Sequence, residues 1–375
     1  MIYSALHKWA EVLIDFSVEA MPGQTAILHG DIEAMELIEA CYEKLMKKGV
    51  SVDLYITPAY FAEIQMRHAP ESVVKNPPMG LLHAVQNADI YIRIGADSNT
   101  KLLVNAPLSK LALASKAKEP LMETIMQRAK EKKLRWVYTH FPTAAAAQEA
   151  DMGTQEYRDF IYSLCYLDAC HPMEKWREIE KKQQKWTDYL SKKKQLHFTN
   201  AMGTDLWVDV EGMRWINCCG KCNFPDGEVY TGPNLQAKNG GVNGTARYSF
   251  PVIYRHVEVR DIELVFEKGA VVQANASKGQ DFLRDILSQD PGAKFVGEIA
   301  IGTNMQMNRI TKNILFDEKF GGTFHLALGR GYPETGNTNA SSHHWDITFD
   351  LREDGKIKAD GQSILENGKF TPDFR

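Results

Sequence analysis

The chain has 375 residues, of which 44% are hydrophobic and 25% are charged, and its formal net charge is −4. A chain of this length can form one large domain or two, each with its own apolar core. No apolar run reaches the roughly 18 residues that a membrane-spanning helix needs, and the small negative charge gives no electrostatic reason to expect nucleic acid or an anionic membrane as a partner.

The N-terminal stretch MIYSALHKWAEVLIDF carries charges inside an apolar pattern. Lys8, Glu11 and Asp15 at this spacing are typical of an amphipathic helix, and they interrupt the apolar core that a signal peptide requires. We therefore expect a helix over about 3–20 and a cytoplasmic protein.

The rest of the first half alternates predicted strands with predicted helices. After a turn at Pro22-Gly23 the expected elements are strand 25–30, helix 31–48, strand 50–57, a helical stretch, strand 88–96, a Lys-rich helix around 118–133 and strand 134–141. This alternation indicates parallel pairing with helices on both faces of the sheet. Neither G-x-G-x-x-G after the first strand nor G-x-x-x-x-G-K-[ST] occurs, so the sequence does not support a phosphate-binding loop.

A long charged helix is expected over 172–195, and its lysines alternate with acidic residues as on a solvated surface. We expect it to join two domains, because the character of the chain changes after it. The segments after it are short, alternate in polarity and are separated by Gly and Asp-Gly turns, with one further helix at 278–289. Asp354-Gly355 lies between alternating segments and predicts a β-hairpin. The predicted fold class is thus α/β: an N-terminal α/β domain with a mostly parallel sheet over 1–185, and a β-rich α+β domain over 186–375.

Six cysteines allow two interpretations. Cys219 and Cys222 have the spacing of half a zinc site, but Cys165 and Cys170 beside His171 have the wrong spacing for the other half. Cytosolic thiols are normally reduced, and the favoured interpretation is therefore buried apolar thiols and not structural zinc.

The stretch SSHHWDITFD over 341–350 reads as a strand that carries two histidines and an aspartate. Side chains of a strand alternate between its faces, so His344 and Asp346 point the same way, whereas His343 and Trp345 point the other way. Such a His-x-Asp pair is suited to half of a metal site. It is equally suited to a surface pair.

Three more residues of metal-ligand type lie in unusual contexts in the second half. Glu228 follows a Pro-Asp-Gly turn, Glu298 interrupts the apolar run VGEIAIG, and His325 lies between Phe324 and Leu326. Each has an ordinary alternative: a turn residue for Glu228, a paired carboxylate for Glu298 and a hydrogen-bonded core histidine for His325. A carboxylate in an apolar run costs several kcal/mol unless it is paired.

Together these residues offer about five oxygen and nitrogen ligands without any cysteine. That mixture suits a hydrolytic centre with two divalent ions of the zinc, cobalt or manganese type. Such a centre also needs a group that moves a proton and a donor for the developing oxyanion. Glu298 suits the first role and Tyr332 the second.

Five motifs in order also resemble a known family. They are GEVYTGP after NFPD, GEIA in an apolar run, LFDE, HLALGRGY and HWD. Over about 195–375 they resemble the M29 family of metallo-aminopeptidases, the group of aminopeptidase T, aminopeptidase S and PepS, whereas the first half resembles it only in its general α/β character.

The resemblance implies metal ligands at Glu228, Glu298, His325, His344 and Asp346, and catalytic roles for Glu298 and Tyr332. It also implies two metal ions per chain, peptide substrates with a free N-terminus, and a homodimer. His343 is expected to have no metal role, and Trp345 is expected to pack behind the His-x-Asp pair.

Two other functions remain open at this stage. Relatives on the same fold resemble mononuclear non-haem iron dioxygenases that open dihydroxypyridine rings with one Glu and a His-x-Asp, an iron site that needs only three protein ligands. The second alternative is a protein that binds peptides or small molecules without catalysis. Metal stoichiometry separates the first alternative from the peptidase, and turnover separates the second.

Overall fold

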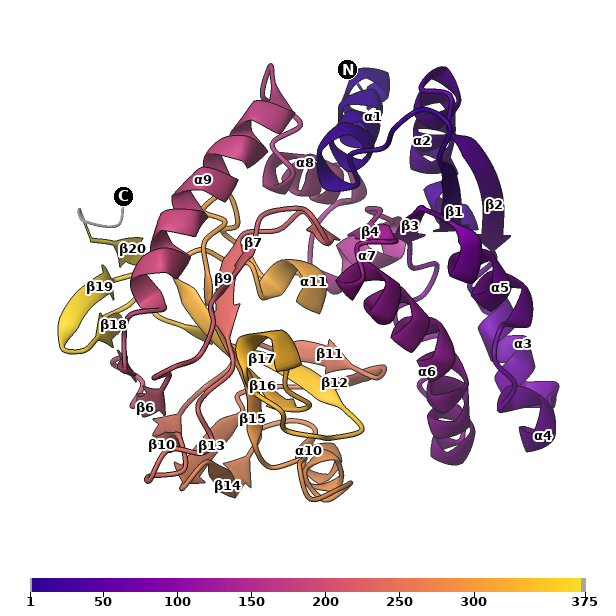
Figure 1. The fold of residues 1–375 in the computed structure, drawn as a ribbon. Coiled ribbons are helices and arrows are strands. Elements are labelled where there is room, and N and C mark those ends of the chain that lie inside the picture. The colour runs from indigo at the N-terminus through magenta and orange to yellow at the C-terminus, as the bar shows by residue number, and fades with distance from the viewer. Residues whose placement is uncertain (1, 372–375) are drawn as a thin grey trace. The chain divides into compact units, whose positions relative to one another are not determined.

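The computed structural model describes residues 2–371, which form two compact units (Figure 1). Unit 1 consists of Met1–Trp176 with Gly220–Pro225, and unit 2 consists of Arg177–Cys219 with Asp226–Arg375. The division falls within α9 (Pro172–Leu190), the helix that the sequence predicts between two domains. Within residues 2–371, no helix is long and apolar enough to cross a membrane.

Unit 1 is built around a five-stranded sheet in the order β2-β1-β3-β4-β8, in which every pair is parallel. Its strands are β1 (Thr25–Asp31), β2 (Ser51–Thr57), β3 (Ile90–Gly95), β4 (Arg135–His140) and β8 (Asn223–Phe224). The predicted alternation and parallel pairing are confirmed. The short β8 was not predicted, because its two residues come from a segment 83 positions after β4.

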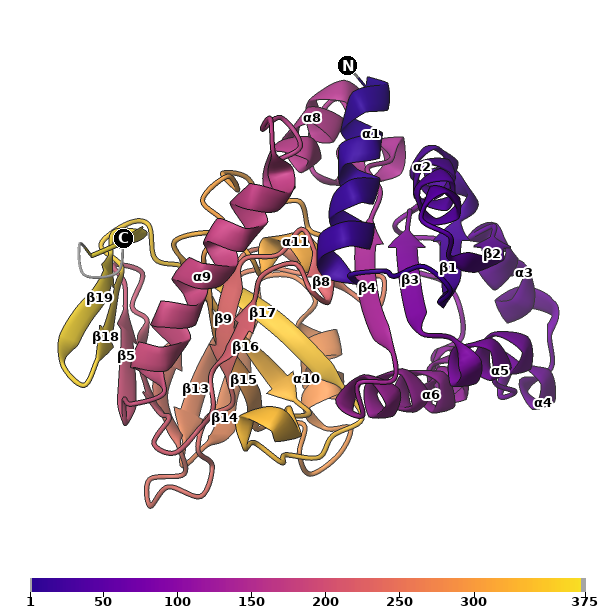
Figure 2. The same cartoon turned by 45° about the horizontal axis from the view of Figure 1, so that its top comes forward.

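Helices cover both faces of this sheet (Figure 2). They are α1 (Ile2–Glu11), α2 (Met35–Lys47), α3 (Tyr60–His68), α4 (Glu71–Val74), α5 (Met79–Asn87), α6 (Leu108–Lys130), α7 (Ala144–Glu149) and α8 (Thr154–Leu164). Ile27 of β1 packs in one buried cluster with Leu81 and Leu121 of α5 and α6. Gly30 of the same strand lies against Ile38 of α2, so closely that a Cβ there would stand 2.2 Å from Cδ1 of Ile38. Odd and even positions of β1 therefore face different helices.

Two helical details differ from the prediction. The first helix continues beyond α1 as a π-helical segment, Val12–Ser17, and ends before residue 20. Helix α6 begins at Leu108, well before the predicted start at 118, and contains Pro120. The Ala-, Leu- and Lys-rich residues before this proline favour a helix strongly enough to extend it in the N-terminal direction.

Unit 2 contains two antiparallel sheets. The larger, in the order β14-β13-β10-β6-β5-β18-β19-β20, consists of β5 (Gln195–Thr199), β6 (Asp205–Asp209), β10 (Val242–Ala246), β13 (Glu263–Glu267), β14 (Ala270–Asn275), β18 (Lys356–Ala359), β19 (Gln362–Glu366) and β20 (Lys369–Phe370). The smaller, in the order β17-β16-β15-β9-β7, consists of β7 (Ile216–Cys218), β9 (Glu228–Thr231), β15 (Val296–Gly302), β16 (Thr323–Gly329) and β17 (His344–Asp350). Unit 2 also contains a ribbon of β11 (Val252–Tyr254) and β12 (Val257–Val259), the helices α10 (Gln280–Leu287) and α11 (Ile314–Asp317), and α9 from Arg177 onward.

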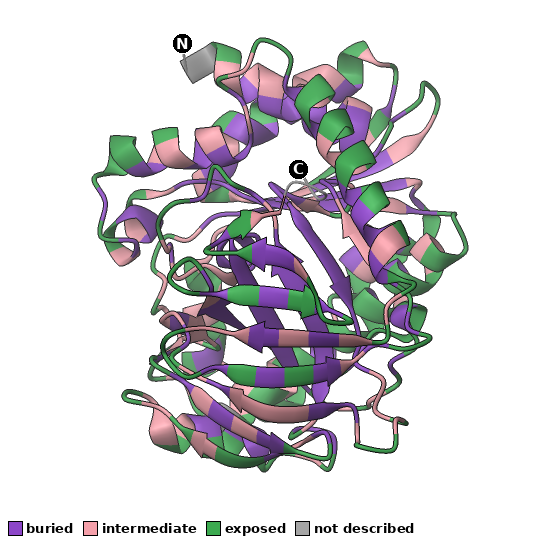
Figure 3. Cartoon of the chain, turned by 90° about the vertical axis from the view of Figure 1, so that its left-hand side faces the viewer, coloured by how far each residue is buried: buried purple, intermediate pink, exposed green. Residues whose placement is uncertain are grey.

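The core of unit 2 lies where apolar side chains of both sheets meet. Phe198 and Leu206 from the larger sheet and Ile299, Leu326 and Ile347 from the smaller sheet belong to one buried cluster. Strands such as β6 and β18 alternate between buried and more exposed residues, whereas every residue of β15 and β16 is buried (Figure 3). The smaller sheet is therefore covered on both faces, and polar side chains on its second face are buried.

The predicted hairpin at Asp354-Gly355 is wrong. Asp354 does adopt the positive φ of a tight turn, 48°, but β17 before it pairs with β16, whereas β18 after it pairs with β5 and β19. The chain therefore passes from the smaller sheet to the larger sheet at this turn. The hairpin lies one turn later, at Asp360-Gly361 between β18 and β19.

The prediction of buried thiols holds for only part of the set. Cys41, Cys165 and Cys219 are buried, but Cys170 and Cys222 are exposed and Cys218 is half-buried. Cys170 and Cys222 lie in bends outside the helices and strands, where a side chain need not pack in a core.

Candidate metal centre

All five predicted metal ligands project from one face of the smaller sheet of unit 2. In the strand register Glu298 lies opposite Ala327, which lies opposite Asp346, and His344 lies opposite Gly329. The next rows place Ala300 opposite His325, and Gly302 opposite Glu228. Ligands thus alternate with Gly and Ala across the strands. These small residues leave space between the ligand side chains, as a bound ion requires.

The other face of the same strands is apolar. Ile299, Leu326 and Ile347 form one row of it, and Trp345 is fully buried there and stacks on Tyr254, with ring centroids 4.9 Å apart. The prediction that His344 and Asp346 share one face, with Trp345 on the other, is confirmed.

A β-bulge places Glu298 on the polar face. The register between β15 and β16 shifts between Val296 and Glu298, so that one extra residue lies in β15. The extra residue is Gly297, where a Cβ would stand 2.3 Å from the carbonyl oxygen of Arg330. Bulges commonly redirect a side chain at a functional site, and here only glycine fits the space.

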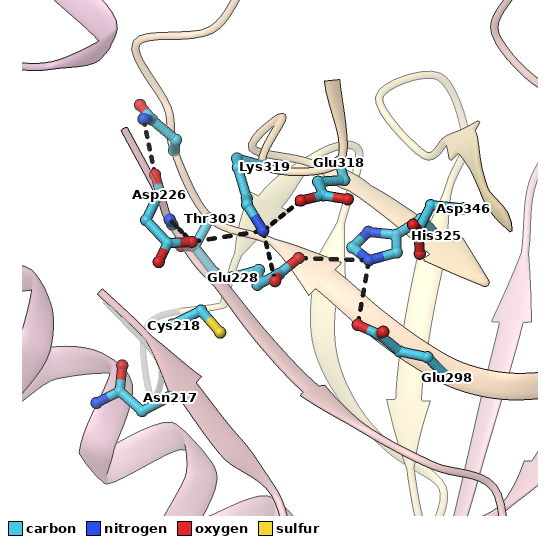
Figure 4. Close-up of polar contacts among 12 residues, drawn as sticks. Asn217, Cys218, Asp226, Glu228, Glu298, Thr303, Glu318, Lys319, His325 and Asp346 are labelled. Atoms are coloured by element: carbon cyan, nitrogen blue, oxygen red, sulfur yellow. Dashed lines mark hydrogen bonds and ion pairs between the residues drawn. The ribbon is translucent and has the colours of Figure 1, made fainter. Parts of the chain in front are cut away.

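Ligand atoms from three strands converge at the Glu228 end of the centre. Nε2 of His325 is 3.3 Å from Oε2 of Glu228 and 3.5 Å from Oε1 of Glu298 (Figure 4). One ligand atom from each of these residues lies within 4.8 Å of the others, the spacing that a shared metal ion needs. We call this group site A.

The second group uses the other oxygen of Glu298. Nε2 of His344 is 3.2 Å from Oε2 of Glu298 and 3.3 Å from Oδ1 of Asp346, and the three residues form a second candidate metal group, site B. Nδ1 of His344 is 2.7 Å from the carbonyl oxygen of Arg330. Donation from Nδ1 to this carbonyl leaves the Nε2 lone pair for a metal, the usual arrangement for a ligating histidine.

Unsatisfied atoms in the centre also fit a bound cation. Within the described residues, Oε2 of Glu228, Nε2 of His325 and Oδ1 of Asp346 are buried and make no hydrogen bond of normal geometry, although they lie close to other ligand atoms. Buried polar atoms without partners are rare in folded proteins and costly. Divalent ions would satisfy all three.

The electrostatic balance favours positive charge in the centre. Burial lowers the pKa of His325, but the nearby carboxylates of Glu298 and Glu228 outweigh it and raise the pKa to about 9. Burial raises the pKa of Asp346, but nearby positive charges, that of the adjacent His344 foremost, together outweigh this effect and lower the pKa to about 2. Protons on the histidines thus occupy the place that cations would take, and metal binding would release them.

Tyr332 lies beside site B. Its ring centroid is 4.9 Å from that of His344 and 5.4 Å from that of Tyr230, and 37% of the residue is exposed. Desolvation raises the pKa of Tyr332 above its ordinary value, so the phenol is protonated at neutral pH and able to donate. His343 is buried and belongs to none of the metal groups found among the described residues.

A buried lysine next to the centre was missed by the sequence analysis. Lys319 is only 2% exposed, and its Nζ lies 2.5 Å from Oε1 of Glu228, 2.7 Å from Oε1 of Glu318 and 3.5 Å from Oδ1 of Asp226 (Figure 4). The signal in the sequence is a charged triplet, Asp-Glu-Lys, between Phe316 and Phe320. Charges bracketed by buried aromatic residues indicate an internal ion pair.

Comparisons with known proteins cover the whole chain. The M29 family, described as thermophilic metalloproteases, matches residues 3–370. Aminopeptidase 2 of Geobacillus stearothermophilus is 28% identical over 405 residues, covering 99% of this chain and 96% of the relative. The prediction that the first half shares only its general character with the family is therefore wrong, although none of the quoted motifs lies in that half.

Two solved structures share the fold. Wild-type AmpT from Thermus thermophilus matches with a TM-score of 0.84 at 24% identity, covering 99% of this chain and all of the other. A 2,5-dihydroxypyridine dioxygenase from Pseudomonas putida KT2440 matches with a TM-score of 0.59 at 14% identity, covering 99% of this chain and 97% of the other. One architecture therefore occurs in proteins named for a peptidase and for an oxygenase.

Proposed function

We propose that this chain, which belongs to the M29 family of metalloproteases, is an aminopeptidase that hydrolyses the N-terminal peptide bond through a water activated by two divalent ions. The observation that carries the two-metal proposal is that Glu298 presents one carboxylate oxygen to site A and the other to site B. A carboxylate shared in this way is suited to holding two ions close together.

The charge of the centre also supports the binding of two metal ions. Among the described residues, five carboxyl groups surround it with one lysine, namely Asp226, Glu228, Glu298, Glu318, Asp346 and Lys319. Burial raises the pKa of Glu318 to about 8, so a nearby cation would be needed to ionise it fully at neutral pH. With all five carboxyl groups ionised in this way and both histidines neutral, the net charge would be four negative units, which two divalent ions would neutralise. Zinc, cobalt and manganese are the proposed ions, because the ligands are nitrogen and oxygen only.

The protein residues then have distinct tasks. When bound, the two ions supply an activated water and polarise the scissile carbonyl. The family resemblance also implies a proton-transfer role for Glu298: one of its oxygens would have to leave its ion to accept the proton of the water and return it to the leaving amine. The Tyr332 hydroxyl donates a hydrogen bond to the oxyanion that develops on the carbonyl oxygen.

The names of the relatives support peptides with a free N-terminus as substrates. Aminopeptidase 2 of Geobacillus stearothermophilus and aminopeptidase T of Thermus thermophilus align over 99% of this chain. A free amine is a good ligand for one ion of a pair, which would align the first peptide bond with the other. We also propose a homodimer, which the family resemblance implies, and a cytoplasmic location, which the charges within the N-terminal apolar pattern favour.

The second candidate function is ring cleavage at a single non-haem iron. It is favoured by the fold shared with the dioxygenase and by site B, which by itself contains one His and two carboxylates. Site A has no task in that reaction. Its convergence on Glu298 therefore favours the peptidase.

The test compares one short peptide, such as Leu-Gly-Gly, in free and N-acetylated forms. We expect release of leucine from the free peptide alone, loss of cleavage on chelation, and recovery when zinc, cobalt or manganese is restored. Cleavage of both forms would contradict the aminopeptidase proposal, and so would failure to cleave either form with two ions bound.

A further inference from the structure

Lys319 contacts the candidate centre without being a metal ligand. Its Nζ donates to Oε1 of Glu228, whereas Oε2 of the same carboxylate faces Nε2 of His325 (Figure 4). One oxygen of Glu228 is therefore held by an ammonium group and the other is directed into site A. A freely rotating carboxylate could bind an ion through either oxygen or both.

The backbone holds Lys319 in this place. Its carbonyl oxygen accepts a hydrogen bond from the amide of Asn304, whose side chain donates to the carbonyl oxygen of Asp226. At Gly302 a Cβ would stand 2.0 Å from the carbonyl oxygen of Phe320, so the segment after α11 is packed directly on β15. These contacts fix the backbone of Lys319 beside the centre, and its Nζ is held there by the carboxylates of Glu228, Glu318 and Asp226.

We propose that Lys319 is a positioning residue, which fixes Glu228 as a one-oxygen ligand of the metal ion in site A. The proposal rests on the two-metal function proposed above and extends it to a residue outside the ligand set. Partners of metal ligands orient them, and losing such a partner typically weakens metal binding about 10- to 100-fold.

A purely electrostatic role predicts the opposite result. Lys319 carries positive charge beside the metal ligands, so its removal would strengthen the attraction between the remaining carboxylates and a cation. A purely structural role predicts lower stability with no selective effect on one ion. The direction of the change in metal affinity, and its restriction to one site, therefore distinguish the three roles.

The experiment measures the two zinc affinities of the full chain by competition with a chromophoric chelator, in wild type and in Lys319→Met, which keeps the length of the side chain without its charge. We expect one of the two zinc ions to bind about 10- to 100-fold more weakly, the other to change by a few-fold at most, and the rate of peptide cleavage to fall at zinc concentrations that saturate the wild type.

The control is Lys48→Met, which removes a lysine that pairs with Asp15 in unit 1 and belongs to neither site. It is expected to keep both zinc affinities and the rate. Unchanged or tighter zinc binding in Lys319→Met would overturn the positioning role and leave the proposed function intact. A wild-type protein that binds no divalent ions would remove both.

A second measurement needs no variant and decides the case if Lys319→Met does not fold. In a crystal structure of the zinc-loaded wild type, Oε1 of Glu228 is expected to stay within hydrogen-bond distance of Lys319 Nζ while Oε2 alone binds zinc. Binding of zinc through both oxygens of Glu228 would overturn the proposal.

Discussion

Exchange of Tyr332 for phenylalanine tests the proposed chemistry with the smallest change to the structure. Phenylalanine keeps the ring that packs against His344 and Tyr230 at centroid distances of 4.9 and 5.4 Å, and it removes only the hydroxyl. Loss of one oxyanion donor typically lowers kcat by about 10²–10³, or about 2.7–4 kcal/mol of transition-state stabilisation. We therefore expect a loss of that size with both metal ions retained.

The assay measures kcat and KM for a free tripeptide, together with the metal content of the same preparation. Because the hydroxyl acts on charge that develops in the transition state, kcat should fall while KM stays nearly constant. Tyr189→Phe is the control, since the Tyr189 hydroxyl donates to Gln362 on the protein surface, and it should keep the full rate. A Tyr332→Phe enzyme within a few-fold of the wild-type kcat would refute the donor role, and loss of metal would show that the residue acts through the ligands.

Three further predictions address metal sharing, titration and packing. Glu298→Gln should bind less than one zinc ion per chain, because both sites share this carboxylate, whereas Asp346→Asn should retain about one; equal losses by elemental analysis would contradict the sharing. Burial lowers the pKa of His29 to about 3, so the folded state keeps it neutral; the stability this confers is present above pH 6.5 and is lost as the pH falls toward 3. When urea unfolding is measured at pH 7 and at pH 5, the free energy of unfolding of the wild type should fall by about 2 kcal/mol more than that of His29→Asn. Equal losses in the two proteins would contradict the lowered pKa. Trp345→Ala should cost about 3–5 kcal/mol, since this ring is fully buried; a cost below 1 kcal/mol would argue against its place in the core.

The placement of some candidate ligands could be predicted from local patterns, whereas the full set of five was implied by the family resemblance. Strand periodicity places His344 and Asp346 on one face and Trp345 on the other, and the structure agrees. An acidic residue in an apolar run, such as Glu298, indicates a partner even when the partner is unknown.

Features that depend on distant contacts could not be predicted in this way. Lys319, in the turn after α11, pairs with Glu228 of β9, which lies 91 residues earlier in the chain, and no local pattern reports that pairing. Asp354-Gly355 forms a turn as its residue types require, but whether a turn closes a hairpin depends on which sheet accepts the next strand. The sharing of Glu298 depends on one bulge residue, Gly297, whose effect appears only in the register with β16.

The most direct test of the account is the metal content of the purified protein, measured per chain by elemental analysis after loading with zinc, cobalt or manganese and removal of excess ion. We predict two divalent ions per chain. Chelation should remove both ions and abolish peptide cleavage. A single bound iron without cleavage of a free peptide would contradict the account, and it would assign Glu298, His344 and Asp346 to a one-iron centre.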